Sequence, residues 1–347
     1  MRYAPLLRRD TFPVSCFAPD LPRGTMVAET STRGARMSGF CRTRKRIHVL
    51  LLLVAGVCAA QALAGDEVKD TGKCLLWRVR SGGATVYLLG SLHFGKPALY
   101  PLDPTIEKAF AESECLVTEV NLNPANQRKL DQLTSARGVY PAGESLERDV
   151  APDTLRRLKE YLESRGMRLA DVSRLRPWLV AMTLMQQETV RAGFRADLGL
   201  DKCFLKCAVA AKKPILTLET VESQAGIMAD GTREEHELAL RHMLDQLPDL
   251  GEMMTAVTEA WQAGDAEAID TLSRRYRSDD GRLAPALKRL RDDRNERMAR
   301  TIEGFLETDK TYFAVVGCMH LVGEKGIVRL LRSRGSRIEQ LDKTGRR

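Results

Sequence analysis

The chain lacks the short motifs that mark several common enzyme classes. It contains no Gly-x-Ser-x-Gly nucleophile elbow, no Gly-x4-Gly-Lys-Ser/Thr phosphate loop and no Gly-x-Gly-x-x-Gly dinucleotide fingerprint. Because each motif supplies a backbone shape that its chemistry needs, an activated-serine mechanism and nucleotide binding have no support. Internal repeats and low-complexity segments are missing too, so a repeat architecture is not expected.

Most of the chain also lacks an excess of charge of either sign. The formal net charge is +8, but residues 1–64 alone carry ten Lys/Arg against three Asp/Glu. Residues 65–347 carry 44 basic and 43 acidic side chains. A body so close to neutral gives no electrostatic basis for binding DNA or RNA, so no nucleic-acid partner is expected.

No apolar run is long enough for a comfortable membrane span. The basic residues 42–46 precede an apolar stretch at 47–60, which is followed by Ala62-Leu63-Ala64. This order is typical of a secretory signal peptide, here at about residues 42–64 with cleavage after Ala64. We therefore expect an exported protein, periplasmic or secreted. If the segment stayed uncleaved, it would be the only membrane contact.

The remaining sequence is expected to form one domain, residues 65–347. Residues 1–36 have no periodicity and lie upstream of a complete signal peptide, and Met37 would begin an ordinary leader. We therefore expect translation to start at Met37.

Few cysteines would remain after cleavage. Eight in the whole chain become five: Cys74, Cys115, Cys203, Cys207 and Cys318. With an odd number, at least one must stay free or pair between chains. Cys203 and Cys207 lie one helical turn apart, and without a second pair they are better explained as packing residues than as a zinc site.

Histidine is scarce as well, yet two of the five histidines stand in matching phrases. Gly90-Ser91-Leu92-His93 follows the apolar run 85–89, and Gly317-Cys318-Met319-His320 follows the apolar run 312–316. Each run predicts a buried strand, and each Gly predicts a turn that brings its His to the rim of a sheet. His236 and His242 stand six residues apart on one predicted helix, so they are interpreted as separate surface residues rather than as a His-Glu-x-x-His pair.

The arrangement of apolar runs predicts an α/β fold. The runs at 85–89, 115–118, 214–218 and 312–316 are nearly continuous, which is typical of buried, mostly parallel strands covered by helices. Helical periodicity fills about 126–205 and 232–307. We expect a central, mostly parallel sheet flanked by helices, with a large helical insertion between the N- and C-terminal halves of the sheet.

Four ionisable residues follow those strands. They are His93, Glu119, Glu219 and His320. Ligands of open parallel sheets bind outside the carboxyl ends of the strands, and imidazole with carboxylate is a donor set for divalent metals. Such an ion would activate water for hydrolysis. Taken singly, Glu119 could be a solvated strand end, Glu219 a helix cap, and Arg294 part of a solvated helix face.

The chain resembles the TraB/GumN family, which is related to the TIKI metalloproteases. The resemblance covers nearly all of residues 75–341. It is carried by Tyr87–His93, Val117–Val120, Gly199–Asp201, Leu218–Thr220, Ala260–Asp265, Arg294-Asn295 and Val316–Gly323, and the paired GxxH phrases with the intervening Glu are its specific part.

The resemblance implies a metal-dependent hydrolase built around His93, Glu119 and His320, with a peptide bond as the substrate. On that basis we expect Mn²⁺, Co²⁺ or Zn²⁺, with Asp201 or Glu219 as fourth ligand or general base and Arg294 stabilising the oxyanion.

The substrate would be a polypeptide or a small molecule, and the oligomeric state is left open. The alternative is a non-catalytic periplasmic protein that binds a metal, haem or another ligand on the same scaffold.

Overall fold

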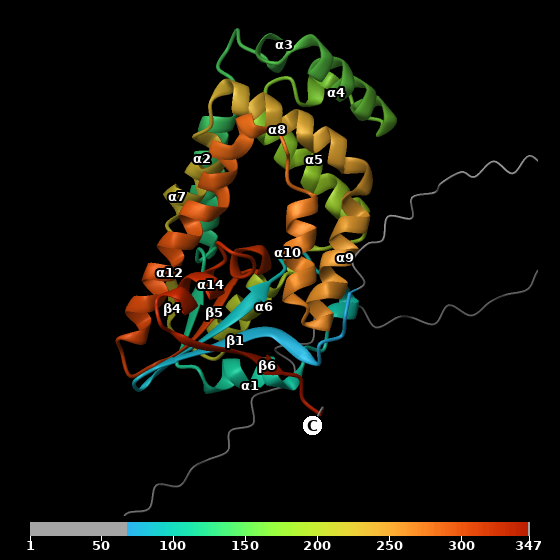
Figure 1. Cartoon of the computed structure of the whole chain (residues 1–347). Helices are drawn as coiled ribbons and strands as arrows, with labels where there is room; N and C mark the ends of the chain where they lie inside the picture. Colours follow the sequence, from blue (N-terminus) through green and yellow to red (C-terminus); the bar gives the residue numbers. More distant parts are fainter. Residues whose placement is uncertain (1–67, 346–347) are drawn as a thin grey trace, which may run out of the picture. The chain divides into compact units, whose positions relative to one another are not determined.

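The computed structural model describes residues 68–345 (Figure 1). The expected signal peptide, its cleavage point and the expected start at Met37 all lie outside the described residues. Within them, no helix combines the length and the apolar character that a membrane crossing requires.

A six-stranded sheet confirms the predicted fold class. Its strands are β1 (Lys73–Ser81), β2 (Ala84–Ser91), β3 (Cys115–Thr118), β4 (Ile215–Thr217), β5 (Thr311–Gly317) and β6 (Arg337–Asp342), in the spatial order β4-β3-β5-β2-β1-β6. The four strands from β4 to β2 are parallel, and β1 runs antiparallel to both β2 and β6. The expected burial of all four apolar runs is wrong for β4: it is an edge strand, and Leu216 is 37% exposed.

Most of the helices lie in the two long intervals β3–β4 and β4–β5, whereas α1, α13 and α14 lie outside them in the sequence. The bounds of all the helices are α1 Pro104–Glu112, α2 Pro124–Gly138, α3 Leu146–Asp149, α4 Pro152–Ser164, α5 Pro177–Arg191, α6 Leu200–Ala210, α7 Val221–Ala229, α8 Arg233–Gln246, α9 Leu250–Ala263, α10 Ala266–Arg275, α11 Ala284–Leu287, α12 Asp293–Leu306, α13 Cys318–Leu321 and α14 Ile327–Ser333. Thus α2 to α6 lie between β3 and β4 in sequence, and α7 to α12 between β4 and β5.

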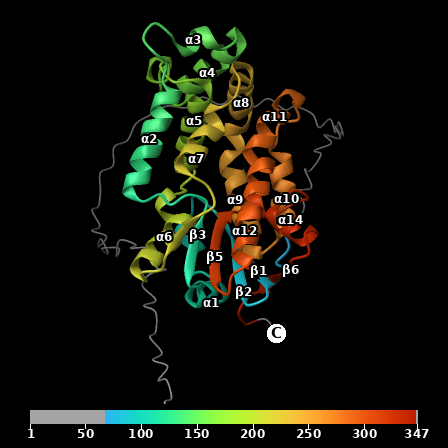
Figure 2. The same cartoon turned by 90° about the vertical axis from the view of Figure 1, so that its left-hand side faces the viewer.

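The buried apolar side chains form two clusters. The larger one surrounds the sheet and includes Phe110, Phe204 and Phe313, whose rings pack against one another with centroids 4.8–5.5 Å apart. The smaller one joins α4, α5 and α8 around Leu158 and Leu184. Figure 2 shows these three helices at the opposite end of the described region from the strands. The sheet therefore has a core of its own, independent of the distal helices.

The side chains of Thr232 and Asp265 cap the first turns of α8 and α10. Thr232 and Glu235 form a capping box, in which the Thr232 hydroxyl accepts from the Glu235 N–H at 3.1 Å and the Glu235 carboxylate accepts from the Thr232 N–H at 2.8 Å. Asp265 caps α10 by accepting from the Ala268 N–H at 2.9 Å. The prediction of surface positions for His236 and His242 is only partly right, because both are half-buried.

The five cysteines of the described region form no disulfide. Cys207 lies in the sheet core and Cys203 packs against that core, as the packing interpretation requires.

Candidate functional site

The strand register brings the two GxxH phrases to one edge of the sheet. In the parallel pair of β2 and β5, Ser91 lies opposite Gly317, so His93 and His320 leave neighbouring strands at nearly the same level. Glu119 follows β3 on the other side of β5. Glu219 follows β4, and its backbone N–H donates to the Glu119 carbonyl oxygen at 2.8 Å. All four residues that the sequence placed at strand ends therefore lie at the same edge.

We call His93, Glu119, Glu219, Arg294 and His320 the paired-histidine site. Its centre is a small space kept open by Gly317. A Cβ atom on Gly317 would lie 3.3 Å from Glu119 Oε1, 3.4 Å from His93 Nε2 and 3.4 Å from His320 Cδ2. The backbone N–H of Gly317 donates to Glu119 Oε1 at 2.8 Å, which fixes that carboxylate at the border of the space. His93, His320 and Glu119 thus surround the position that the Cβ atom of any residue other than Gly at 317 would occupy.

A carboxylate behind the ring orients His93. Its Nδ1 lies 2.8 Å from Asp201 Oδ2, and the same oxygen accepts from the Ser91 hydroxyl at 2.6 Å. Asp201 stands in the first turn of α6. The His93 side chain is 61% exposed, and the charge of Asp201 raises the pKa of His93 to about 9. With Nδ1 held by Asp201, Nε2 is the ring atom that faces the central space.

An amide plays the corresponding part for His320. Its Nδ1 lies 2.6 Å from Asn295 Oδ1, and since an amide oxygen only accepts, the proton of the ring sits on Nδ1. Asn295 is fully buried, and its Nδ2 donates to the Lys325 carbonyl at 2.7 Å, which fixes the orientation of the amide. Burial lowers the pKa of His320 to about 4, so the ring is neutral at pH 7 and carries its lone pair on Nε2.

Arg294, from α12, joins the carboxylates to His320. Its Nη2 donates to Glu119 Oε2 at 2.6 Å and to Glu219 Oε2 at 2.7 Å, and its Nε donates to Glu219 Oε1 at 3.0 Å. Its Nη1 donates to His320 Nε2 at 3.0 Å. The side chains of Arg294, Glu119 and Glu219 are only 10%, 9% and 2% exposed. The guanidinium therefore pairs with two buried carboxylates at once, and the three groups together keep one negative charge.

The ionisation of Glu119 follows from its neighbours. Burial alone would raise its pKa, but His320, His93 and Arg294, together with the N–H of Gly317, lower it below the ordinary value. Glu119 is therefore a carboxylate at neutral pH and accepts on both oxygens.

The structure also gives positions to the remaining candidates. Asp201, expected as a ligand or base, lies behind His93 at Nδ1, where it positions the ring. Both oxygens of Glu219 accept from Arg294, and Oε2 also accepts from Gln224 Nε2 at 3.0 Å. The solvated helix face that Arg294 suggests by itself is wrong, because Arg294 is 8% exposed.

The sequence did not reveal that Asn295 orients the His320 ring, although Asn295 adjoins Arg294 in the family-like phrase. Within residues 68–345, no three His, Cys, Asp or Glu side chains are already arranged to hold a metal ion. Arg294 donates to both Glu119 and His320 in this structure.

Known proteins resemble this chain over most of the described region. The family model for TraB/PrgY/gumN matches residues 75–340. The uncharacterized protein YbaP of Escherichia coli strain K12 is 26% identical over 170 residues, which cover 49% of this chain and 55% of YbaP. An uncharacterized protein of Treponema pallidum strain Nichols is 25% identical over 246 residues, which cover 67% of this chain and 72% of that protein.

The chain thus spans little more than half the length of the YbaP protein that it matches. No solved structure matches it.

Proposed function

The chain belongs to the TraB/PrgY/gumN family, and from this membership and the geometry of the paired-histidine site we propose that it is an exported, metal-dependent hydrolase acting on peptide bonds. One observation carries the proposal. Two histidines from separate parts of the chain each have Nδ1 held by an acceptor, and both rings border the same small space together with Glu119.

The residues around this space fit a divalent ion. Two imidazoles and one carboxylate are a common donor set for Zn²⁺, and Mn²⁺ and Co²⁺ accept the same donors. Acceptors behind ligand histidines are the usual support of metal sites, since they fix the ring and its tautomer. We assign His93, His320 and Glu119 as the ligands. Gly317 supports the assignment because its missing side chain leaves the space that an ion needs.

A divalent ion held there would act as a Lewis acid, lowering the pKa of water and polarising the scissile carbonyl. The other residues have roles of their own. Asp201 would accept the Nδ1 proton of His93 and Asn295 that of His320, so that Nε2 is left in each ring as the nitrogen that could bind the ion. Loading also requires Arg294 to release His320 Nε2, while Glu219 can keep its hold on the guanidinium through two N–H donors.

Released in this way, Arg294 presents N–H donors beside the reacting centre and is the proposed oxyanion donor. Glu219 is then a positioning residue for Arg294. Glu119 has two carboxylate oxygens, so one could bind the ion, and we assign to the other the proton of the attacking water.

The test is metal content in the full chain, purified without chelator and without a histidine tag. Wild type should hold about one divalent ion per chain after incubation with Mn²⁺, Co²⁺ or Zn²⁺, and His93→Ala and His320→Ala should hold none while keeping their circular dichroism spectra. Equal metal content in wild type and both variants would refute the assignment. A peptide-library screen with the loaded protein then tests for hydrolysis.

One observation favours the alternative, a non-catalytic periplasmic protein that binds a metal, haem or another ligand. Arg294 already forms ion pairs with both Glu119 and Glu219, so a metal ion is not the sole source of positive charge beside these buried carboxylates. Wild type that takes up no ion, but develops a Soret band with haem, would favour this second function.

A further inference from the structure

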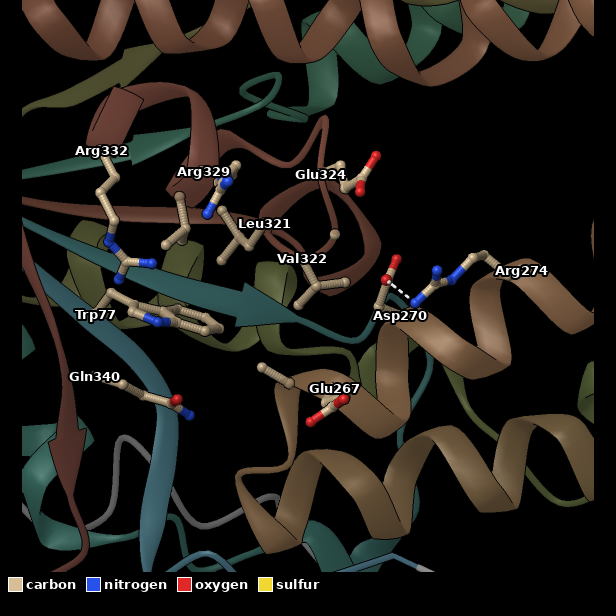
Figure 3. A pocket seen from close by; sticks show the side chains of 13 residues that line it. Trp77, Glu267, Asp270, Arg274, Leu321, Val322, Glu324, Arg329, Arg332 and Gln340 are labelled. Atoms are coloured by element: carbon tan, nitrogen blue, oxygen red, sulfur yellow. Dashed lines mark ion pairs between the residues drawn. The ribbon is translucent and has the colours of Figure 1, made fainter. Parts of the chain in front are cut away.

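A second cavity lies beside α14, formed by residues outside the paired-histidine site. Its volume is about 630 Å³, within the range of small-molecule binding sites. It is lined by Trp77, Ala266, Glu267, Asp270, Arg274, Leu321, Val322, Gly323, Glu324, Val328, Arg329, Arg332 and Gln340. We call it the α14 pocket (Figure 3).

One wall of the α14 pocket carries two arginines without partners. Arg329 and Arg332 are three residues apart on α14, so they lie on the same face of the helix. Both are exposed, and neither forms a hydrogen bond or an ion pair with any residue of the described chain. Arg334, which follows the last residue of α14, is paired by contrast: it contacts Glu296 and Glu303. The unpaired fork donors are available to an anion.

The floor of the pocket is apolar and carries one unused donor. Leu321, Val322 and Val328 are buried, and the Trp77 side chain is only 4% exposed. Across residues 68–345 the indole N–H of Trp77 donates no hydrogen bond, although buried indole groups normally find an acceptor. Figure 3 shows Arg332 extending toward this ring. An apolar group on the floor would therefore lie directly beside the positive wall.

Two of the three acidic residues that line the pocket, Asp270 and Glu267, stand on the side opposite the arginines, and the third, Glu324, precedes α14. Asp270 is neutralised by Arg274 at 2.6 Å. Gly323 permits this arrangement, since a Cβ there would come within 2.3 Å of Asp270 Oδ1. Glu267 has no ion-pair partner in the described region, and Figure 3 places it across the pocket from the arginines. Polyanions such as nucleotides are disfavoured by these carboxylates, whereas a ligand with one carboxylate and nearby N–H donors is matched.

We propose that the α14 pocket binds the C-terminal residue of a polypeptide. The free carboxylate lies against Arg329 and Arg332, and the last side chain, apolar, lies on the floor beside Trp77. The N–H groups of the peptide backbone face Glu267. This recognition does not depend on the paired-histidine site or on a metal ion.

Fluorescence anisotropy with labelled pentapeptides tests the proposal. The probe is fluorescein-Gly-Ser-Gly-Ala-Leu with a free carboxylate, and it is compared with the same peptide as a C-terminal amide and with one ending in Asp. The protein is the full chain carrying His93→Ala, in buffer with EDTA, so that no cleavage interferes. We expect both control peptides to bind at least about tenfold more weakly. The amide loses the charge-assisted contact with Arg329 and Arg332, and the Asp peptide loses the apolar contact with the floor. N-acetyl-leucine should compete.

Two double variants separate the pocket from general charge. Arg329→Gln/Arg332→Gln should weaken the leucine peptide at least about tenfold. Arg80→Gln/Arg337→Gln removes two charges from exposed strand residues outside the pocket and should change binding less than about twofold. Equal binding of acid and amide, unchanged binding by the Arg329/Arg332 variant, or no binding of the leucine peptide at millimolar concentration would overturn the proposal.

Discussion

Replacing Arg294 by Met tests how the paired-histidine site is held together. The substitution keeps an unbranched apolar stem and removes the guanidinium that contacts Glu119 at 2.6 Å and Glu219 at 2.7 Å. Both carboxylates are less than a tenth exposed, so water cannot replace the lost donors without rearrangement. Breaking a buried ion pair by removing one partner typically costs about 3–5 kcal/mol. For a domain of this size such a loss lowers Tm by about 10 °C.

The matched control is Arg297→Met, one turn further along α12. Arg297 also contacts Glu219, but at 3.9 Å and with half of its side chain exposed. An exposed pair of this kind contributes about 0–1 kcal/mol, so Tm should move by no more than about 3 °C. Thermal unfolding followed by circular dichroism in EDTA gives both values. If Arg294→Met melted within 2 °C of wild type, the guanidinium would not be the counter-charge on which the two carboxylates depend.

The same variant addresses the ion. Without Arg294, the acceptors on Glu119 and His320 are free, and a divalent cation can supply the missing positive charge. Adding Mn²⁺ or Zn²⁺ should therefore raise the Tm of Arg294→Met more than that of wild type, in proportion to the binding that the ion gains. An equal Tm increase in both proteins would show that arginine and ion do not compete for this site.

Three further predictions concern other positions. Gly317→Ala should keep the wild-type Tm within about 3 °C but abolish metal uptake, because its Cβ fills the central space; retained stoichiometry would show that the space is not the ion position. Glu235→Gln should lower the free energy of unfolding by about 1 kcal/mol at pH 7 in urea titrations. The hydrogen bond from Arg289 lowers the pKa of Glu235 in the folded protein. The carboxylate therefore stabilises the fold fully above about pH 4.3, and this stabilisation is lost as the pH falls through the folded-state pKa; a Glu235→Gln effect as large at pH 3 as at pH 7 would contradict it. Iodoacetamide at pH 8 should label Cys203 before Cys74 in peptide mapping, because a hydrogen bond from Cys207 lowers the pKa of Cys203 while burial raises that of Cys74 to about 12; equal rates would refute this.

The edge at which the site forms could be predicted from the sequence. Uninterrupted apolar runs indicated parallel strands, and parallel strands in one sheet place their carboxyl ends together. Gly90 and Gly317 marked where two of those strands end. The run at 214–218 misled in one respect, because apolar composition does not tell an edge strand from a central one. Since pairing position depends on the whole sheet, the exposure of Leu216 followed only from the structure.

The partners behind the two histidines could not be predicted in the same way. In sequence, Arg294 and Asn295 lie in a helix segment dense with charge, which by composition alone indicates a solvated face. They are buried because they pair with Glu119, which follows β3 and is 175 residues from Arg294, and with His320 in α13, so the energy that holds them there is tertiary. Asp201 was singled out by its family-like phrase as a ligand or base, but a metal ligand and a residue that orients a histidine can carry the same side chain. Only the contact with His93 Nδ1 separates the two roles.

The two GxxH phrases look equivalent in sequence, yet their histidines differ chemically because different helices supply the groups behind them. A carboxylate from α6 stands behind His93 and raises its pKa to about 9, whereas an amide from α12 stands behind His320, whose pKa burial lowers to about 4. At neutral pH without an ion, His320 therefore offers a lone pair while His93 holds a proton that must leave before its Nε2 can bind a metal. Arg294 donates a hydrogen bond to the Nε2 lone pair of His320, and this bond stabilises His320 in its neutral, ion-free form. The repeated phrase thus sets where the two rings lie, and the groups behind them set which ring must lose a proton before it can accept a cation.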